Sequence, residues 1–167
     1  YTVLLVMSGN FTERGDVSII SKWDKTEIAL KAGIDLVIEL PYFFASQSSD
    51  VFARGAIQIL HTLGAEAVVF GSESNNVNSL IQIASTCSNN KKYDKLVKAY
   101  LEEGLNYPTA LSKAIYDLTG KKISKPNDIL GLSYIKEIIR LNSCMKPITI
   151  PREDNFNDNF LYDTITS

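Results

Sequence analysis

VLLVMSGNFTER, residues 3–14, sets the fold of this chain, because five consecutive apolar residues stop abruptly at three small or turn-forming ones. An unbroken apolar run of this length is typical of a strand buried on both faces of a parallel sheet. Open α/β sheets bind ligands just beyond the carboxyl ends of their strands, so Ser8, Gly9 and Asn10 are candidate pocket residues. The alternative is an ordinary strand-to-loop turn.

Two further strand–helix units follow at short intervals. Ser21 is the expected cap of a helix, and residues 35–40 form a second strand that Pro41 ends. A helix over 50–63 and a third strand over 66–70 complete the series. Strand, loop and helix in such close succession predict an α/β fold with a Rossmann-like, doubly wound parallel sheet and right-handed crossovers.

The middle of the chain changes character, because helix follows helix from about residue 76 to 120. We expect this segment to be a helical insertion or lid between strands of the sheet. Its apolar spacing predicts helices over 77–87, 93–103 and 109–118. A helix over 128–141 and a last strand over 145–150 are then expected to return the chain to the sheet.

Composition restricts the classes of function. The apolar fraction of 45% and the charged fraction of 22% are those of a soluble globular protein. A net charge of −2 provides no global basic field for nucleic acid, although a local patch can serve instead. Cys87 and Cys144 lack CxxC spacing, which favours a reduced, cytoplasmic protein, and no apolar run is long enough to span a membrane. Because the chain opens at Tyr1 inside a strand, without an initiator Met, we expect it to be a piece of a longer protein.

Several familiar sites are not supported. His61 is the only histidine and lies among apolar helix positions, so a helix-face or core role is favoured and neither a Ser-His-Asp triad nor a zinc site can be assembled. The motifs GxGxxG and GxxxxGK[ST] are absent. Tyr42, Phe43 and Phe44 are predicted to serve core or interface packing, with base stacking as the lesser alternative.

Four turns follow a strand or open a helix: Ser8-Gly9-Asn10, Glu39-Leu40-Pro41, Gly71-Ser72-Glu73 and Pro126-Asn127-Asp128. Loops that follow parallel strands emerge on one edge of a sheet, so we expect the first three to converge. Glycine allows a ligand close to the backbone, and helix N-termini present unpaired amides to an anion. The set suits a nucleotide better than a hydrophobic ligand.

These segments together resemble the bacterial tRNA(Met) cytidine acetate ligase family, part of the nucleotidyltransferase-like superfamily of Rossmann-type folds. The resemblance is carried in order by VMSGNFTERGD (6–16), SKWDKTEIALKAGIDLVIELP (21–41), DVFARGAIQIL (50–60), VVFGSE (68–73), SKPNDILGLSYI (124–135) and MKPITIPRE (145–153). It covers nearly the whole chain, and the combination is specific where no single motif is. It implies that residues 1–167 are part of a nucleotidyltransferase-like catalytic domain.

The resemblance implies an ATP-dependent, tRNA-modifying ligase of the cytoplasm. Acetate would attack the α-phosphate of ATP, giving acetyl-adenylate and pyrophosphate. The acetyl group would then pass to N4 of the wobble cytidine of elongator tRNA(Met), giving N4-acetylcytidine. Positioning supplies most of the catalysis of such a transfer, and Mg²⁺ is expected to accompany the phosphates.

Matching the family residue by residue implies that Gly71, Asn127 and Arg152 bind ATP. Position alone suggests that further residues line the substrate pocket: Ser8, Gly9, Asn10, Arg14, Lys22, Ser72 and Glu73. The family's phosphate-binding run, Asn-Pro-Phe-His-x-Gly-His, would fall before Tyr1, and its Ser-Ile-Arg segment would begin after Ser167. We therefore expect this chain alone to be inactive or poorly active, and neither a catalytic residue nor a metal ligand is assigned.

Two other functions compete with this one. A small-molecule adenylyltransferase of the same superfamily predicts a compact chain, which the helical segment 76–118 argues against. A non-catalytic nucleotide- or RNA-binding module is supported by the missing phosphate motif, although truncation explains that absence equally well.

Overall fold

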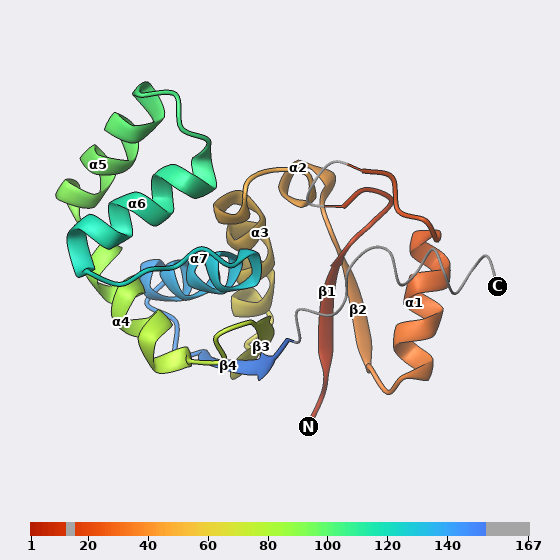
Figure 1. Cartoon of the computed structure of the whole chain (residues 1–167). Coiled ribbons are helices and arrows are strands. Elements are labelled where there is room, and N and C mark those ends of the chain that lie inside the picture. Colours follow the sequence, from red (N-terminus) through yellow and green to blue (C-terminus); the bar gives the residue numbers. More distant parts are fainter. Residues whose placement is uncertain (13–15, 153–167) are drawn as a thin grey trace.

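The computed structural model describes residues 1–12 and 16–152. Helices outnumber strands, and Figure 1 shows them gathered around one strand pair while the other pair packs against α1. In chain order the elements are β1 (Leu4–Ser8), α1 (Lys22–Lys31), β2 (Leu36–Leu40), α2 (Tyr42–Ala45), α3 (Ser49–Thr62), β3 (Ala67–Ser72), α4 (Val77–Cys87), α5 (Lys91–Glu102), α6 (Tyr107–Thr119), α7 (Pro126–Arg140) and β4 (Lys146–Pro151).

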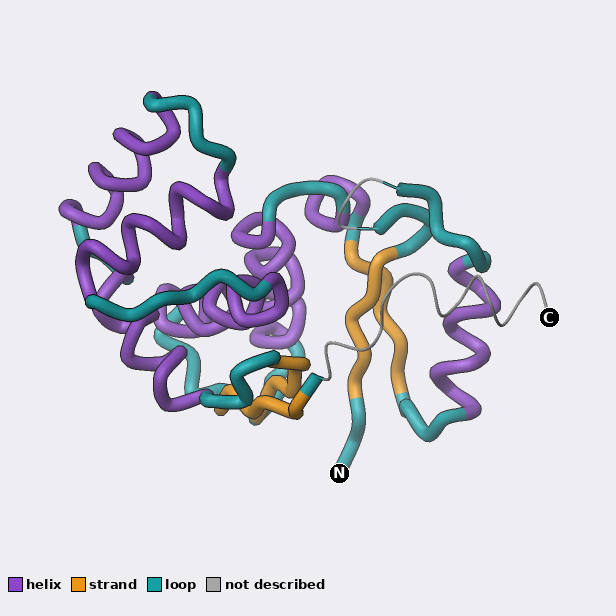
Figure 2. The backbone as a smooth tube through the Cα atoms, in the orientation of Figure 1, coloured by secondary structure: helices purple, strands orange, loops and turns teal. Residues whose placement is uncertain are grey.

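All described strand pairings between these elements are parallel, which confirms the α/β class. β1 pairs with β2 from Leu4–Leu36 to Ser8–Leu40, and β3 pairs with β4 from Ala67–Lys146 to Ser72–Pro151. The pairs form two separate two-stranded sheets within the described residues rather than one continuous sheet (Figure 2). Each described strand therefore has a single strand neighbour.

The strands are only partly buried, so the two-sided burial expected for the first strand is not seen. Every position of β1 is only half-buried. In β3, Val68 and Phe70 are buried while Val69 between them is 57% exposed, as expected when helices cover one face only. Helix α1 contributes no buried residue, and its Trp23 is 74% exposed.

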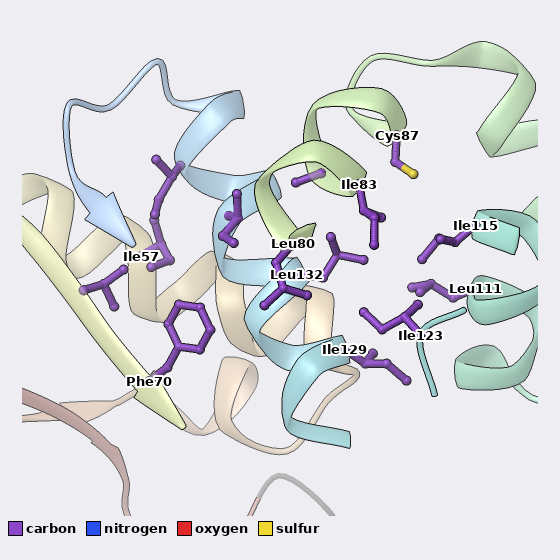
Figure 3. Packing of buried hydrophobic residues seen from close by; sticks show 14 of the residues in the cluster. Ile57, Phe70, Leu80, Ile83, Cys87, Leu111, Ile115, Ile123, Ile129 and Leu132 are labelled. Atoms are coloured by element: carbon purple, nitrogen blue, oxygen red, sulfur yellow. The ribbon is translucent and has the colours of Figure 1, made fainter. Parts of the chain in front are cut away.

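The core lies where α3, α4, α6 and α7 meet the inner face of β3. Leu132 of α7 is fully buried, and Phe70 of β3 lies beside Tyr134 with ring centroids 5.5 Å apart. Figure 3 shows the apolar side chains of these elements pointing toward one another. Gly131 permits this packing, because a Cβ there would overlap the Phe70 ring.

A polar network ties α6 to α3 and α7. Asp50, in the first turn of α3, accepts hydrogen bonds from the Tyr107 hydroxyl and from the Ser133 hydroxyl at 2.6 Å, and it lies 3.6 Å from Lys136 Nζ. Burial would raise the pKa of Asp50, but Lys136 and these hydroxyls together hold it below its ordinary value. The carboxylate is therefore ionised at neutral pH, with its charge compensated inside the fold.

The predicted helices and strands are confirmed with ends that shift by at most two residues. Ser21 caps α1 by accepting from the Asp24 amide, and the third strand is longer than expected because it includes Gly71 and Ser72. Sequence spacing missed α2, a single turn formed by the aromatic cluster 42–45. Within the described part of the chain, none of the helices combines the length and the apolarity that crossing a membrane requires.

Candidate functional site

Glu73 closes the N-terminus of α7. Its Oε1 accepts from the Asn127 amide at 3.1 Å and from Asn127 Nδ2 at 2.8 Å, and its Oε2 accepts from the Asp128 amide at 2.9 Å. Burial would raise the pKa of Glu73, but these donors hold it below its ordinary value. A group with a lowered pKa contributes stability above the unfolded value and loses it in acid, so this cap is complete at neutral pH. The expectation that these amides are unpaired is therefore wrong, since a carboxylate of the chain already occupies them.

Asn127 also forms a hydrogen bond with Arg152. Its Oδ1 accepts from Arg152 Nη1 at 3.0 Å, while its amide nitrogen donates to Glu73. The Arg152 backbone amide donates to the Ser72 carbonyl at 3.0 Å, which places the side chain at the shared end of β3 and β4. The guanidinium is thus exposed and contacts Asn127 through Nη1, which leaves its other N–H groups as donors for an anionic ligand.

Gly71 lies directly beside Arg152. A Cβ built at Gly71 would be 3.6 Å from Arg152 Cδ and 3.7 Å from its Cβ, which is ordinary van der Waals contact. The described protein atoms therefore leave room for a side chain at this position. The three residues matched to ATP binding, Gly71, Asn127 and Arg152, are brought together by these contacts.

A buried pair supports the turn from below. Ser72 is fully buried, and its hydroxyl donates to Asp128 Oδ1 at 2.5 Å. The Ser74 amide also donates to the Asp128 carboxylate, at 3.3 Å. The Ser72 hydroxyl is thus committed to holding the turn, whereas Glu73, the next residue, accepts a hydrogen bond from the Asn127 side chain.

A second group gathers at the end of β1. Gly9 lies against the Glu39 carboxylate, which pairs with Lys22 Nζ at 2.8 Å. Lys25 Nζ contacts the carbonyl oxygens of Ser8 at 3.0 Å and Gly9 at 2.5 Å. Beside them is a cavity of about 160 Å³, lined by Gly9, Asn10, Phe11, Glu39, Leu40, Tyr42 and Ala45.

The four turns thus form two groups rather than one. The turns ending β1 and β2 meet through Gly9 and Glu39, and the turn ending β3 meets the start of α7 through Glu73 and Asn127. No hydrogen bond or ion pair between the described residues joins the first group to the second. The strands lie in two separate pairs, which explains why the loops do not share one edge. Arg14, predicted beside Lys22, lies outside the described residues.

Sequence reasoning missed Lys25 as a member of these groups, and it named Asp128 in one of the four turns without pairing it with Ser72. Lys25 lies three residues after Lys22 on α1, a spacing that places both on one helix face, so this signal was available. Asp128 is 56 residues from its partner Ser72, and local spacing could not have paired them. His61 lies in the last turn of α3, and a hydrogen bond of 3.0 Å joins its Nδ1 to the Ser143 hydroxyl. This position agrees with the helix-face role expected for it.

A further cavity of about 450 Å³ lies between β2 and α3 and is almost entirely apolar. This chemistry does not suit a triphosphate. The residues lining it are Leu36, Ile38, Pro41, Phe44, Gly55, Gln58, Ile59, Thr62 and Leu63.

The acidic groups near Arg152 do not form a magnesium site by themselves. Glu73 and Asp128 both accept hydrogen bonds from protein donors, and the described residues hold no cluster of three or more His, Cys, Asp or Glu side chains placed around an ion. Mg²⁺ commonly takes one or two carboxylates together with substrate phosphates and water. The carboxylates of Glu73 and Asp128 are therefore already occupied by donors of the protein itself.

Comparisons with known proteins find similarity along nearly all of this chain. Residues 1–167 match the family described as HIGH nucleotidyl transferase. The tRNA(Met) cytidine acetate ligase of Geobacillus sp. (strain WCH70) is 43% identical over 170 residues, which cover 99% of this chain and 42% of that protein. The ligase of the same name from Oceanobacillus iheyensis is 44% identical over 172 residues, covering 99% and 43%. A crystal structure of Thermotoga maritima TmcAL bound with alpha-thio ATP superimposes with a TM-score of 0.84 at 34% identity, covering 99% of this chain and 43% of that one.

Proposed function

The chain belongs to the HIGH nucleotidyl transferase family, and on that premise we propose that it is the ATP-binding part of a tRNA(Met) cytidine acetate ligase. The chain spans about two-fifths of the length of the relatives it matches, so the complete activity is proposed for the longer protein. One observation carries the proposal: hydrogen bonds link Glu73 to Asn127 and Asn127 to Arg152, and Gly71 lies beside Arg152. A relative of the same fold has been crystallised with an ATP analogue, which supports the choice of nucleotide.

Each residue of the series has a distinct proposed role. Arg152 supplies a fixed cation for a phosphate or ribose oxygen, and Asn127 orients that cation because its carbonyl accepts from Nη1. Glu73 holds Asn127 from the other side, so the amide of Asn127 cannot rotate without losing both contacts. Gly71 leaves the end of β3 open, which lets the nucleotide approach the backbone.

The proposed reaction has two steps. A carboxylate oxygen of acetate attacks the α-phosphorus of ATP and pyrophosphate leaves, after which the N4 amine of the wobble cytidine attacks the acyl carbon and AMP leaves. In-line placement of a weak nucleophile is mostly a positioning task, and a rigid ATP site contributes to it. The small cavity beside Gly9 and Asn10 is the proposed place for a small substrate. We propose that Mg²⁺ is held chiefly by the ATP phosphates, and that the enzyme acts in the cytoplasm, where tRNA is found.

The reaction itself is the first test. The protein at the full length of its relatives is incubated with ATP, Mg²⁺, isotope-labelled acetate and elongator tRNA(Met), and the tRNA is digested and analysed by nucleoside mass spectrometry. We expect labelled N4-acetylcytidine that depends on ATP. Normal ATP binding without acetylated nucleoside would contradict the ligase and favour an adenylyltransferase of the same superfamily.

The second test concerns the assigned ATP site. We expect Arg152→Ala to weaken ATP binding about tenfold, since a charge-assisted hydrogen bond contributes about 1.5 kcal/mol. Asn127→Ala should weaken it severalfold, because Arg152 then loses its orienting partner. Isothermal calorimetry measures both, with Arg54→Ala, an exposed arginine of α3, as the control. Affinities equal to the control in both variants would show that the site is misplaced.

A further inference from the structure

Charge is unevenly distributed along this chain. Residues 88–125, which contain α5, α6 and the loop after α6, carry eight lysines and four acidic residues. The rest of the chain carries nine basic and fifteen acidic residues. The small net charge of −2 therefore conceals a basic segment in an otherwise acidic sequence, a separation that is typical of an interaction surface for polyanions.

The surplus lies in two places: the first half of α5, where three lysines accompany Asp94, and the loop 120–125, which has three lysines and no acidic residue. Lys91, Lys92 and Lys95 are exposed, and none of them pairs with an acidic side chain of the described residues. Lys98 differs, because its Nζ lies 3.8 Å from Glu102. Exposed Lys122 lies in the loop that leads from α6 to the start of α7, where Asn127 is placed (Figure 1).

Helix stability does not explain this placement. Lys91 and Lys92 share the first turn of α5 with Asp94, and the positive end of the helix dipole favours the acidic residue but disfavours the two cations. Asn90 already caps the helix by accepting from the amides of Lys92 and Tyr93. Positive charge is thus gathered where it opposes folding, so an external anionic partner is the better explanation.

The apolar residues of α5 point to the kind of partner. Tyr93 is buried and Leu96, Val97 and Tyr100 are half-buried, so the apolar side of the helix is turned toward the protein. A helix that inserts into a membrane surface needs an exposed apolar face, which the first half of α5 lacks. A hydrophilic polyanion is the partner that this surface fits.

We propose that the lysine surface of Lys91, Lys92, Lys95 and Lys122 binds the sugar–phosphate backbone of the tRNA substrate. The inference rests on the proposed ligase function for the identity of the RNA. The loop 120–125 connects this surface to the Asn127–Arg152 site, so RNA bound along α5 and this loop extends toward the bound nucleotide. The surface reads no sequence, since phosphate contacts position an RNA without specifying its bases.

The test compares two charge-matched variants of the full-length protein. The triple variant Lys91→Glu/Lys92→Glu/Lys95→Glu changes the lysine surface, and Lys31→Glu/Arg54→Glu/Lys146→Glu changes three exposed basic residues elsewhere by the same net charge. Affinity for an unmodified tRNA(Met) transcript is measured by fluorescence anisotropy over a series of salt concentrations. We expect the first variant to bind roughly 30-fold more weakly than the control at about 0.1 M salt, with a slope of log K against log salt lower by about 2 to 3.

Each outcome decides between the possibilities. Equal affinity and slope in the two variants overturns the inference, as does a defect confined to binding of anionic lipid vesicles. Glutamate at positions 91 and 92 favours the first turn of the helix, and circular dichroism of both variants shows that each is folded under the binding conditions, so a binding loss cannot be attributed to unfolding. If the wild-type protein acetylates tRNA and the triple variant binds tRNA as tightly as the control, only the proposed role of the lysine surface is refuted. Lysine-dependent RNA binding without acetylation refutes only the ligase function.

Discussion

Replacing Asp50 by alanine is expected to lower the free energy of unfolding by about 3 kcal/mol at pH 7. The change removes the acceptor of the Tyr107 and Ser133 hydroxyls and leaves the mostly buried Lys136 ammonium without its partner. Hydrogen bonds to a charged group contribute about 1.5–3 kcal/mol, and breaking a buried pair on one side costs more than the pair itself contributes. The expected fall in Tm is about 6–12 °C, measured by calorimetry or circular dichroism.

The same substitution has a defined pH dependence. The folded pKa of Asp50 lies below its unfolded value, so the stability it contributes is fully present above about pH 4 and is lost as pH falls through the folded pKa. The difference in stability between wild type and Asp50→Ala should therefore be constant from pH 7 to about pH 5 and shrink in stronger acid. Asp94→Ala is the control, since Asp94 is exposed and its loss should cost at most about 0.5 kcal/mol. A deficit no larger than that of the control would mean that the network does not anchor α6.

Replacing Gly131 by alanine is the second large change and should destabilise the protein by about 2 kcal/mol, although alanine is the better helix former. The added methyl group would lie 2.9 Å from Phe70 Cδ2 and 3.2 Å from Cζ, with Cε2 closer still. So close an overlap places the overpacking cost at the upper end of the usual range, about 3 kcal/mol, and the gain in helix propensity offsets about 1 kcal/mol of it. The Phe70 ring cannot move freely, because it is 92% buried and packs against Tyr134. We expect Tm to fall by about 4–8 °C.

Two further variants test the prediction for Gly131→Ala. Phe70→Leu/Gly131→Ala should recover part of the loss, because the smaller side chain yields space, and the recovery measures the coupling between the two residues. Gly71→Ala is the matched glycine control, since its methyl group meets only ordinary contacts. It should leave stability unchanged while weakening ATP binding, if nucleotide lies against this residue. A Gly131→Ala protein as stable as wild type would show that the ring adapts.

Much of the fold was available from local sequence. Apolar runs bounded by Pro41 or a glycine predicted the strands, and caps such as Ser21 predicted where helices begin, because these signals act over a few residues. The chain order of the motifs also led to the correct family. The single turn of α2 was missed because four residues are too few to show helical periodicity.

The candidate site was only partly predictable, for a physical reason. Gly71, Asn127 and Arg152 could be named from motifs, but their joining depends on contacts such as Glu73–Asn127, which spans 54 residues. That contact also places a carboxylate on amides that sequence reasoning had left free for an anion. The local sequence thus determined which segments become strands, helices and turns. Only the tertiary structure decided that the strands form two pairs, that Glu73 closes α7 and that Asp50 holds α6, because each depends on burial and charge shared between segments far apart in the chain.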